Sequence, residues 1–436
     1  MAIDISKRIY CAIVQNKKEG SDVVVGGWVA EIKSLGKIAF LKLRDRSGVV
    51  QLVSNNPKLI ERIAKITHES VLLAEGKVKS SKLKAGGNEI ELKDFELLSA
   101  ADPKLPIDMS GKIKTDLSKR LDWRVLDLRQ PIHSAVFKIQ SKLVEGAIEW
   151  CAANDFTITF TPCLLGYPSE SGSEMFEVPY FGKNAYLRQD PQLHRQLTIL
   201  AGIDKLVDLG TSWRAELSFT TRHLTEHRTL ALEIGFIKDE FDVMKVEEQL
   251  VAAMMKKVVQ DCKEELKFFP NADFQIPKTP FPVLQFPEVY KILEKLGHKS
   301  KKIDPEAERL LSAYVKEKYR HNFFFLNRFP FEEKPFYVMR VDKEPKFARS
   351  TDLIYRGVEL SSGGQREHRY DKLIENIKIK KMNPNLIEWF TQFFKYAAPP
   401  HGGFCIGIER LTMQLLGLEN IREAVLFPRD PQRLTP

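Results

Sequence analysis

The sequence predicts an α+β protein with a small N-terminal β-barrel and a larger domain of strands and helices. Three observations support this prediction. Residues 23–96 hold five strand-like runs and one helical run, residues 205–236 read as two strands joined by a polar loop, and residues 402–416 read as a glycine-rich strand that leads into a helix. With 436 residues, the chain is long enough for two or three domains.

The composition is that of a soluble globular protein, with 43% hydrophobic and 29% charged residues. No apolar run approaches the ~18 residues of a membrane span. The N-terminus lacks the apolar core of a signal peptide. The five cysteines are widely spaced and form no C-x-x-C pair, so neither a zinc site nor a disulfide framework is indicated. We therefore expect a cytoplasmic protein with no membrane segment.

The net charge of +9 is unevenly spread. Residues 1–100 carry 17 basic and 12 acidic residues, an excess of five positive charges. This excess suits a polyanionic partner. A lysine-rich solvated surface explains the same count, and charge alone favours that second interpretation.

The N-terminal strands and their helix follow the order of an OB-fold, a small barrel often used for oligonucleotides. The five runs cover residues 23–30, 38–44, 48–53, 70–79 and 89–96, and the helix covers residues 57–67. Such barrels stack bases on aromatic side chains in a basic groove. Phe40, Gln51 and Lys33 lie on the candidate binding strands, although the residues alone favour the barrel core for Phe40.

Residues 100–112 contain two prolines and one glycine and read as a linker, which a basic amphipathic segment follows. We expect a barrel domain at 1–103, a linker and hinge at 104–130, and a larger domain at 131–436.

In the larger domain, helical spacing predicts a long helix from Ile132 to about Ala153, stopped by Asn154, before a strand at residues 156–160. A core helix and an interface helix explain this spacing equally well. Residues 240–267 read as another helix. An insertion is expected near residues 268–340, with return strands up to about residue 350.

The hairpin at residues 205–236 carries the first candidate site. Arg214 and Glu216 are two residues apart and would share one face of the first strand, and the loop adds Arg222 and His223. Arginine suits bidentate binding of phosphate or carboxylate. A structural ion pair beside a solvated turn is the alternative, and R-A-E alone favours it.

Two later segments add candidates. Gly407 allows close approach of the backbone to a ligand, and Arg410 begins the following helix, where phosphate binding is favoured. Asp352 and Glu359 are seven apart, and a turn or bulge between strands would bring both to one Mg²⁺ ion.

These segments together resemble one family. WRAE, RHLTE, GGFCIGIERLTMQLLG and the ending NIREAVLFPRDPQRLTP resemble motifs 2 and 3 of the class II aminoacyl-tRNA synthetases. The segments ELSSGGQREHR and DPQLHRQL are similar to those of aspartyl-tRNA synthetases of the archaeal type. The resemblance runs from about residue 23 to Pro436, and it implies an OB-fold barrel before a catalytic domain with an antiparallel sheet flanked by helices.

The resemblance also implies an activity. It points to a homodimeric enzyme that activates L-aspartate with ATP and Mg²⁺ and transfers it to tRNA(Asp), with tRNA(Asn) as a further candidate acceptor. The implied aspartate ligands are Glu170, Gln192, Arg195, Arg214, Ser362 and Arg366. The implied ATP ligands are Arg214, Glu216, Arg222, His223, Glu359, Gly407 and Arg410. The implied metal ligands are Glu359, Ser362 and Asp352.

In the barrel, the resemblance places Phe40 against the middle anticodon base, with Gln51 beside it and Lys33 nearby. Ala30 and Ala85 stand at the two positions that the family associates with discrimination between the aspartate and asparagine anticodons.

Three pocket positions depart from the family pattern. Arg195 replaces a lysine, Asp190 replaces a serine, and Ala231 replaces an acid that normally forms a charge network with that lysine. We expect this network to be rebuilt or lost, with Asp190 as a candidate partner of Arg195.

Three alternatives are an asparaginyl-tRNA synthetase, a paralogue that only binds RNA, and a ligase that gives aspartate to a small acceptor. The segments GGQREH and DPQL argue against the first, the complete set of phosphate-binding residues against the second, and the intact barrel against the third.

Overall fold

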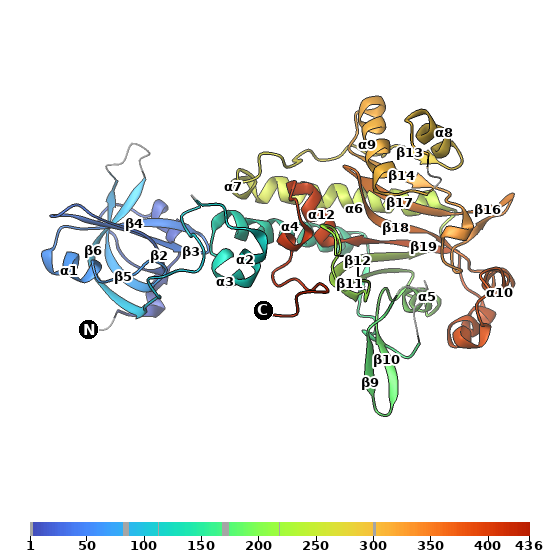
Figure 1. Cartoon of the computed structure of the whole chain (residues 1–436), viewed down its shortest axis with the longest axis horizontal. Coiled ribbons are helices and arrows are strands. Elements are labelled where there is room, and N and C mark those ends of the chain that lie inside the picture. The colour runs from blue at the N-terminus through green and yellow to red at the C-terminus, as the bar shows by residue number, and fades with distance from the viewer. Residues whose placement is uncertain (1–2, 82–86, 112, 168–173, 218, 300–301) are drawn as a thin grey trace. The chain divides into compact units, whose positions relative to one another are not determined.

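The computed structural model describes residues 3–81, 87–111, 113–167, 174–217, 219–299 and 302–436. The chain divides into two compact units, residues 1–114 and 115–436, which we describe separately (Figure 1).

The N-terminal unit is a barrel. Its strands are β1 Arg8–Ile9, β2 Asp22–Ser34, β3 Ala39–Asp45, β4 Gly48–Ser54, β5 Val71–Ser80 and β6 Asn88–Ser99. The sheet order is β1-β2-β3-β4-β6-β5, and a further β2–β5 pairing closes it. Helix α1 (Pro57–Ile63) lies between β4 and β5 in the sequence. All five predicted strands and the helix are present, and the OB-fold is confirmed.

The second unit is built on an eight-stranded sheet (Figure 1). Its order is β13-β14-β17-β18-β19-β12-β11-β7, and the six central strands pair antiparallel. Only the two edge pairs, β7–β11 and β13–β14, are parallel among the pairings of this sheet that the structure describes. The strands are β7 Thr157–Thr159, β11 Lys205–Trp213, β12 Glu226–Gly235, β13 Val283–Gln285, β14 Phe323–Asn327, β17 Ser350–Tyr355, β18 Val358–Arg366 and β19 His401–Gly407.

Two smaller sheets and the helices complete this unit. The smaller sheets contain β8 Leu164–Leu165, β9 Glu177–Tyr180 and β10 Lys183–Leu187, and β15 Arg340–Val341 and β16 Glu344–Ala348. The helices are α2 Leu117–Asp122, α3 Arg124–Asp127, α4 Pro131–Ala153, α5 Gln192–Leu200, α6 Glu240–Asp261, α7 Lys263–Leu266, α8 Glu288–Lys295, α9 Pro305–Tyr319, α10 Tyr370–Ile379, α11 Glu388–Thr391 and α12 Ile408–Leu416. No helix in the described part of the chain is long and apolar enough to cross a membrane.

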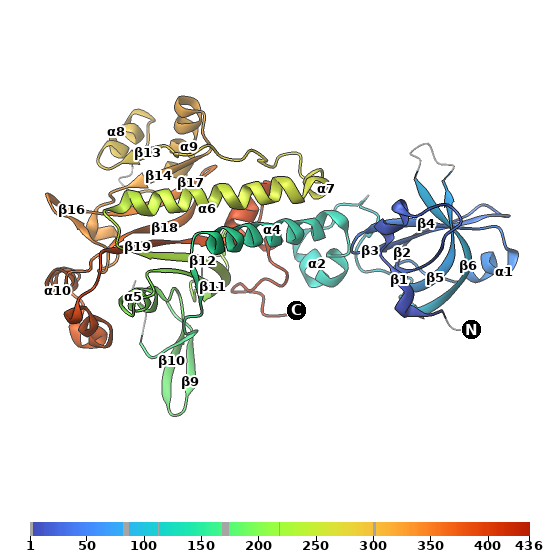
Figure 2. The same ribbon diagram turned by 180° about the vertical axis from the view of Figure 1, so that it is seen from behind.

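Helices α4 and α6 cover one face of the main sheet, as Figure 2 shows. The predicted long helix is α4, and Asn154 caps its C-terminal end as expected. Strand residues that point toward these helices are apolar, such as Leu230, Leu232 and Phe404, and they form the main core. Because side chains alternate along a strand, the residues between them point to the opposite face. That face carries the polar side chains of the site.

The hairpin β11–β12 is confirmed, with Trp213 opposite Glu226 as the last pair. The prediction for its first strand was partly wrong. Strand β11 ends at Trp213, so Arg214 and Glu216 lie in the connecting loop and do not share a strand face. Arg214 still donates its backbone N–H to the Thr225 carbonyl oxygen (2.9 Å), which holds the two ends of the loop together.

The insertion has a core of its own. Helices α8 and α9 pack with β13 and β14 through residues such as Leu284, Val289, Leu311 and Leu326. This core also includes Ile354 of β17, so the insertion is joined directly to the main sheet. The Ser312 hydroxyl on α9 accepts the Gly357 backbone N–H (2.8 Å), which fixes α9 at the β17–β18 turn.

Candidate active site

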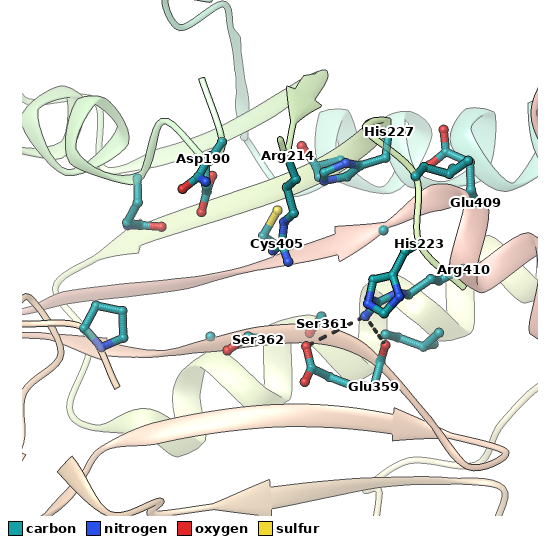
Figure 3. Close-up of a pocket in the computed structure, with 18 of the residues that line it drawn as sticks. Asp190, Arg214, His223, His227, Glu359, Ser361, Ser362, Cys405, Glu409 and Arg410 are labelled. Carbon is teal, nitrogen blue, oxygen red and sulfur yellow. Dashed lines mark hydrogen bonds and ion pairs between the residues drawn. The ribbon is translucent and has the colours of Figure 1, made fainter. Parts of the chain in front are cut away.

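A pocket of about 190 Å³ opens on the polar face of the main sheet. Figure 3 shows Asp190, Arg214 and Cys405 on one side of it and Glu359, Ser362, His223 and Arg410 on the other. Nine predicted site residues line it: Gln192, Arg214, Arg222, His223, Glu359, Ser362, Arg366, Gly407 and Arg410. Arg195, Glu216 and Asp352 are not among the lining residues, and Glu170 lies outside the described residues.

Arg214 enters the pocket from the end of β11 (Figure 3). Its side chain is 49% exposed, and its guanidinium lies 4.0 Å from the Glu216 carboxylate. Because the pair is exposed to solvent and its two groups are far apart, it restrains the Arg214 side chain only weakly. The guanidinium is therefore available to an anionic ligand.

Three further basic or imidazole side chains gather at one end of the pocket. Arg410 on α12 donates from Nη1 to the Glu359 carbonyl oxygen (3.0 Å). Arg222 is paired with Glu308 of the insertion at 3.1 Å. Burial and the charges of Arg410 and Arg222 lower the pKa of His223, which favours its neutral imidazole. This end of the pocket suits the phosphates of a nucleotide.

Two carboxylates, those of Asp352 and Glu359, lie beside the phosphate end of the pocket. Ser362 donates to Asp352 (2.6 Å), and Lys334 pairs with the same carboxylate at 2.7 Å. Burial and the Asp352 charge raise the pKa of Glu359. The register of β17 and β18 shifts between Leu353 and Ile354, which is the bulge that the sequence predicted as a way to bring the two carboxylates together.

The other end of the pocket is a buried network around Arg366. Its Nε donates to Glu233 Oε1 (2.9 Å), and its Nη2 donates to Gln192 Oε1 (2.9 Å). Gln192 in turn donates to Glu233 Oε2 (3.0 Å). Arg366 lines the pocket, and its Nη1 makes no hydrogen bond to the described part of the chain. A carboxylate can therefore approach that edge of the guanidinium.

Arg195 lies behind this network rather than in the pocket lining, and it is 1% exposed. Its Nη2 donates to Asp190 Oδ1 (2.5 Å) and to Gln192 Oε1 (2.9 Å). Its Nη1 lies 3.6 Å from Asp208 of β11, and Asp208 is directly opposite Ala231 in the sheet. The charge network is thus rebuilt, with Asp190 and Asp208 beside Arg195 where the family has an acid at the position of Ala231.

The pocket and network residues that were absent from the sequence-based prediction include Glu233, His227, Asp208, Lys334 and Glu308. Glu233 follows Ala231 by two residues and so shares its strand face, a signal that the sequence did offer. Burial, with Arg214 and Arg410 nearby, lowers the pKa of His227 to about 3 and keeps this pocket-lining ring neutral. Lys334 and Glu308 belong to or follow the insertion, and the sequence gives no sign of where they lie.

In the barrel, the strand register places Lys33 opposite Phe40 and Gln51 opposite Lys42. Phe40 and Lys42 are two apart, so these side chains share one face. Leu41 points the other way, into the core, so the core assignment that the residues favoured for Phe40 was wrong. Ala30 lies at an irregularity in the β2–β3 register, and Ala85 lies outside the described residues.

The fold and pocket are those of a class II tRNA synthetase. The family profile described as tRNA synthetases class II (D, K and N) matches residues 116–431, and the OB-fold nucleic acid binding domain matches residues 23–98. The chain belongs to the class II tRNA synthetase family.

Its relatives are similar over nearly the whole chain. The chain is 42% identical to the aspartate–tRNA(Asp) ligase of Thermococcus kodakarensis, over 98% of this chain and 99% of that protein. It is 40% identical to the aspartate–tRNA(Asp/Asn) ligase of Methanopyrus kandleri, over 99% of this chain and 100% of that protein. The crystal structure of asparaginyl-tRNA synthetase from Pyrococcus horikoshii, complexed with asparaginyl-adenylate, superposes with a TM-score of 0.92 at 33% identity, covering 98% of this chain and 99% of that chain.

Proposed function

We propose that this protein is an aspartate–tRNA ligase, which forms aspartyl-adenylate from L-aspartate and ATP and transfers the aspartyl group to tRNA. The observation that carries the proposal is the shape of the pocket. A buried arginine, Arg366, lies at one end, cations for a triphosphate lie at the other, and Arg214 enters from a side wall.

The reaction is an in-line attack of the aspartate α-carboxylate on the α-phosphorus of ATP, which breaks the bond to the β-phosphate and releases pyrophosphate. It requires that two anions be held together and that their charge be neutralised, with little covalent chemistry from the protein. In this assignment Arg214 binds the α-carboxylate and the α-phosphate. Arg222, His223 and Arg410 bind the β- and γ-phosphates, with Gly407 giving the backbone close access and Glu216 reading the adenine amino group.

In the same assignment, Arg366 binds the side-chain carboxylate of aspartate, with Gln192 beside it. Glu170 takes the α-ammonium group, as the sequence resemblance implies. Arg195 acts from behind, since its guanidinium holds Gln192 and Asp190. The family's lysine is expected to contact the substrate, so this position serves a more indirect role here.

The phosphate end of the pocket, where Glu359 and Ser362 lie, fits Mg²⁺. Mg²⁺ is usually held by one or two carboxylates together with substrate phosphates. Glu359 and Ser362 line the pocket and would hold the ion, while Asp352 is already bound to Lys334 and orients Ser362. No cluster of three or more His, Cys, Asp and Glu residues in the described ranges has the geometry of a metal site. When bound, Mg²⁺ would neutralise developing charge on the phosphates.

The barrel is the proposed anticodon-binding domain, with the Lys33, Phe40 and Gln51 face toward the bases.

We also propose a homodimer. Strand β7 is an edge of the main sheet, and the apolar side chains Ile158 and Phe160 at this edge are 49% and 88% exposed. An unpaired edge with apolar side chains favours pairing with another chain. The cysteines are all free, which agrees with the predicted cytoplasmic location.

Asparaginyl-tRNA synthetase remains the second candidate, because the protein superposes well on one such enzyme. Glu233 and Gln192 occupy the Nε and Nη2 groups of Arg366, and its remaining Nη1 edge favours a carboxylate over a neutral amide.

The choice of tRNA gives a prediction of its own. Ala30 can neither stack on a base nor donate a hydrogen bond to one, so we expect weak reading of the third anticodon position and charging of both tRNA(Asp) and tRNA(Asn). A good base contact is worth about 1–3 kcal/mol of discrimination, and its absence should leave the two transcripts within about tenfold of each other.

The measurement is aspartylation, with labelled aspartate, of transcripts that differ only at that anticodon base. Lys33 or Glu31 is the alternative source of discrimination. Glu31 is already paired with Lys42 at 2.6 Å, which limits its reach toward a base. A preference above about a hundredfold for the aspartate anticodon would refute relaxed recognition, and Lys33→Ala would then show whether Lys33 supplies it. Failure to charge either transcript would count against the ligase itself.

A further inference from the structure

The insertion contacts the Arg222 end of the catalytic pocket through an ion pair between Glu308 and Arg222. Glu308 lies in the first turns of α9, and its Oε2 is 3.1 Å from Arg222 Nη1. Arg222 belongs to the loop between β11 and β12, and its side chain also lines the pocket. Among the residues that the structure describes, this is the only ion pair of the Arg222 side chain.

The backbone of the same loop is held by a different part of the chain. Ile421 donates its backbone N–H to the Thr221 carbonyl oxygen (2.8 Å), and Arg422 donates to the Thr220 carbonyl oxygen (3.0 Å). These hydrogen bonds fix the backbone of the loop but do not restrain the Arg222 side chain. An unrestrained arginine side chain loses substantial rotamer freedom when it binds a ligand.

Glu308 is poorly explained as a stabilising residue. Its side chain is 8% exposed, and it faces a second carboxylate, Glu359. Burial and that neighbour raise the pKa of Glu308 to about 7, against the opposing effect of Arg222. Since the desolvation of a buried ion pair offsets most of its attraction, such a pair adds little to stability. Its geometric effect is to hold one edge of the guanidinium while the rest remains open to the pocket.

We propose that Glu308 is a positioning residue for ATP, through which the insertion holds Arg222 in place for the triphosphate. The inference rests on the proposed function, because it assumes that Arg222 binds phosphate. The insertion thereby becomes part of the nucleotide site. At the amino-acid end, the hydrogen bonds of Arg366 go to Glu233 and Gln192, so Glu308 is not expected to affect aspartate binding directly.

The test is the dissociation constant of ATP with Mg²⁺, measured by calorimetry, and the KM values for ATP and aspartate in pyrophosphate exchange. Glu308→Ala is expected to weaken ATP binding about tenfold, because Arg222 is then no longer held in place before ATP binds. The KM for aspartate should stay within about twofold of wild type. Glu308→Gln keeps an acceptor oxygen and should stay within about threefold of wild type. Glu306, exposed in the same turn of α9, is the matched control, and Glu306→Ala should bind ATP like wild type.

A double-mutant cycle separates positioning from a general loss of structure. If Glu308 acts through Arg222, adding Glu308→Ala to Arg222→Ala should change ATP affinity by less than about twofold. Additive effects, or unchanged or tighter ATP binding by Glu308→Ala, would overturn the inference. These results leave the proposed function intact provided that wild type binds ATP and shows aspartate-dependent exchange. A wild-type protein that binds no ATP would contradict the proposed function first and the inference with it.

Discussion

Arg214→Ala is expected to lower the rate of aspartyl-adenylate formation by about 100- to 1000-fold, because the loss of one preorganised donor to a developing charge costs about 3–4 kcal/mol. In the proposed assignment, Arg214 touches both reactants. Its attraction grows as negative charge accumulates on the α-phosphate, so the loss should appear mainly in kcat.

The measurement is single-turnover adenylate formation at saturating ATP and aspartate. The fold should survive, since Arg214 is 49% exposed and its nearest carboxylate is 4.0 Å away. Arg228→Ala is a matched control in the same hairpin. Arg228 is 43% exposed and is not among the residues that line the pocket. Near-normal adenylate formation by a folded Arg214→Ala protein would contradict the role given to this residue.

The second large effect concerns Arg366. With the wild-type protein, asparagine should be activated about a hundredfold less well than aspartate. Glu233 already pairs with Arg366, but the Nη1 edge of the guanidinium would face a neutral amide in place of a carboxylate, and the lost charge-assisted hydrogen bond costs about 3 kcal/mol. Arg366→Ala should remove most of this preference and reduce aspartate activation by a similar factor. Both effects are measured by comparing kcat/KM for aspartate and for asparagine in the wild-type protein and in Arg366→Ala.

This substitution also leaves Glu233 buried without its ionic partner, so folding must be checked independently. Thermal unfolding monitored by circular dichroism serves this purpose, and Arg366→Lys, which keeps the charge but not the fork of donors, gives a second variant. Equal activation of aspartate and asparagine by the wild-type protein would show that the pocket does not select a carboxylate.

The sequence predicted those parts of the fold that depend on local pattern. Alternation along the barrel strands and along β11 and β12 follows from which face is buried, and Asn154 marks the end of α4. The end of β11 was missed because W-R-A-E continues the alternation. What stops the strand is its partner, since β12 begins at Glu226 opposite Trp213.

Predicted site residues that belong to motifs come together in one pocket, whereas contacts between distant segments could not be predicted. The rebuilt network illustrates this difference. Asp208 becomes a neighbour of Arg195 only through the packing of α5 near β11, and nothing in the local sequence of either residue indicates it. Glu308 reaches Arg222 across 86 positions, because the insertion folds back over the edge of the sheet. No periodicity or motif carries such information.

The central claim is that the pocket joins aspartate to ATP, and ATP–pyrophosphate exchange with each of the twenty amino acids tests it most directly. We predict Mg²⁺-dependent exchange with aspartate, and with asparagine at no more than about one hundredth of that rate. Exchange that is fastest with another amino acid, or absent with all twenty in a folded protein that contains Mg²⁺ and ATP, would contradict the account.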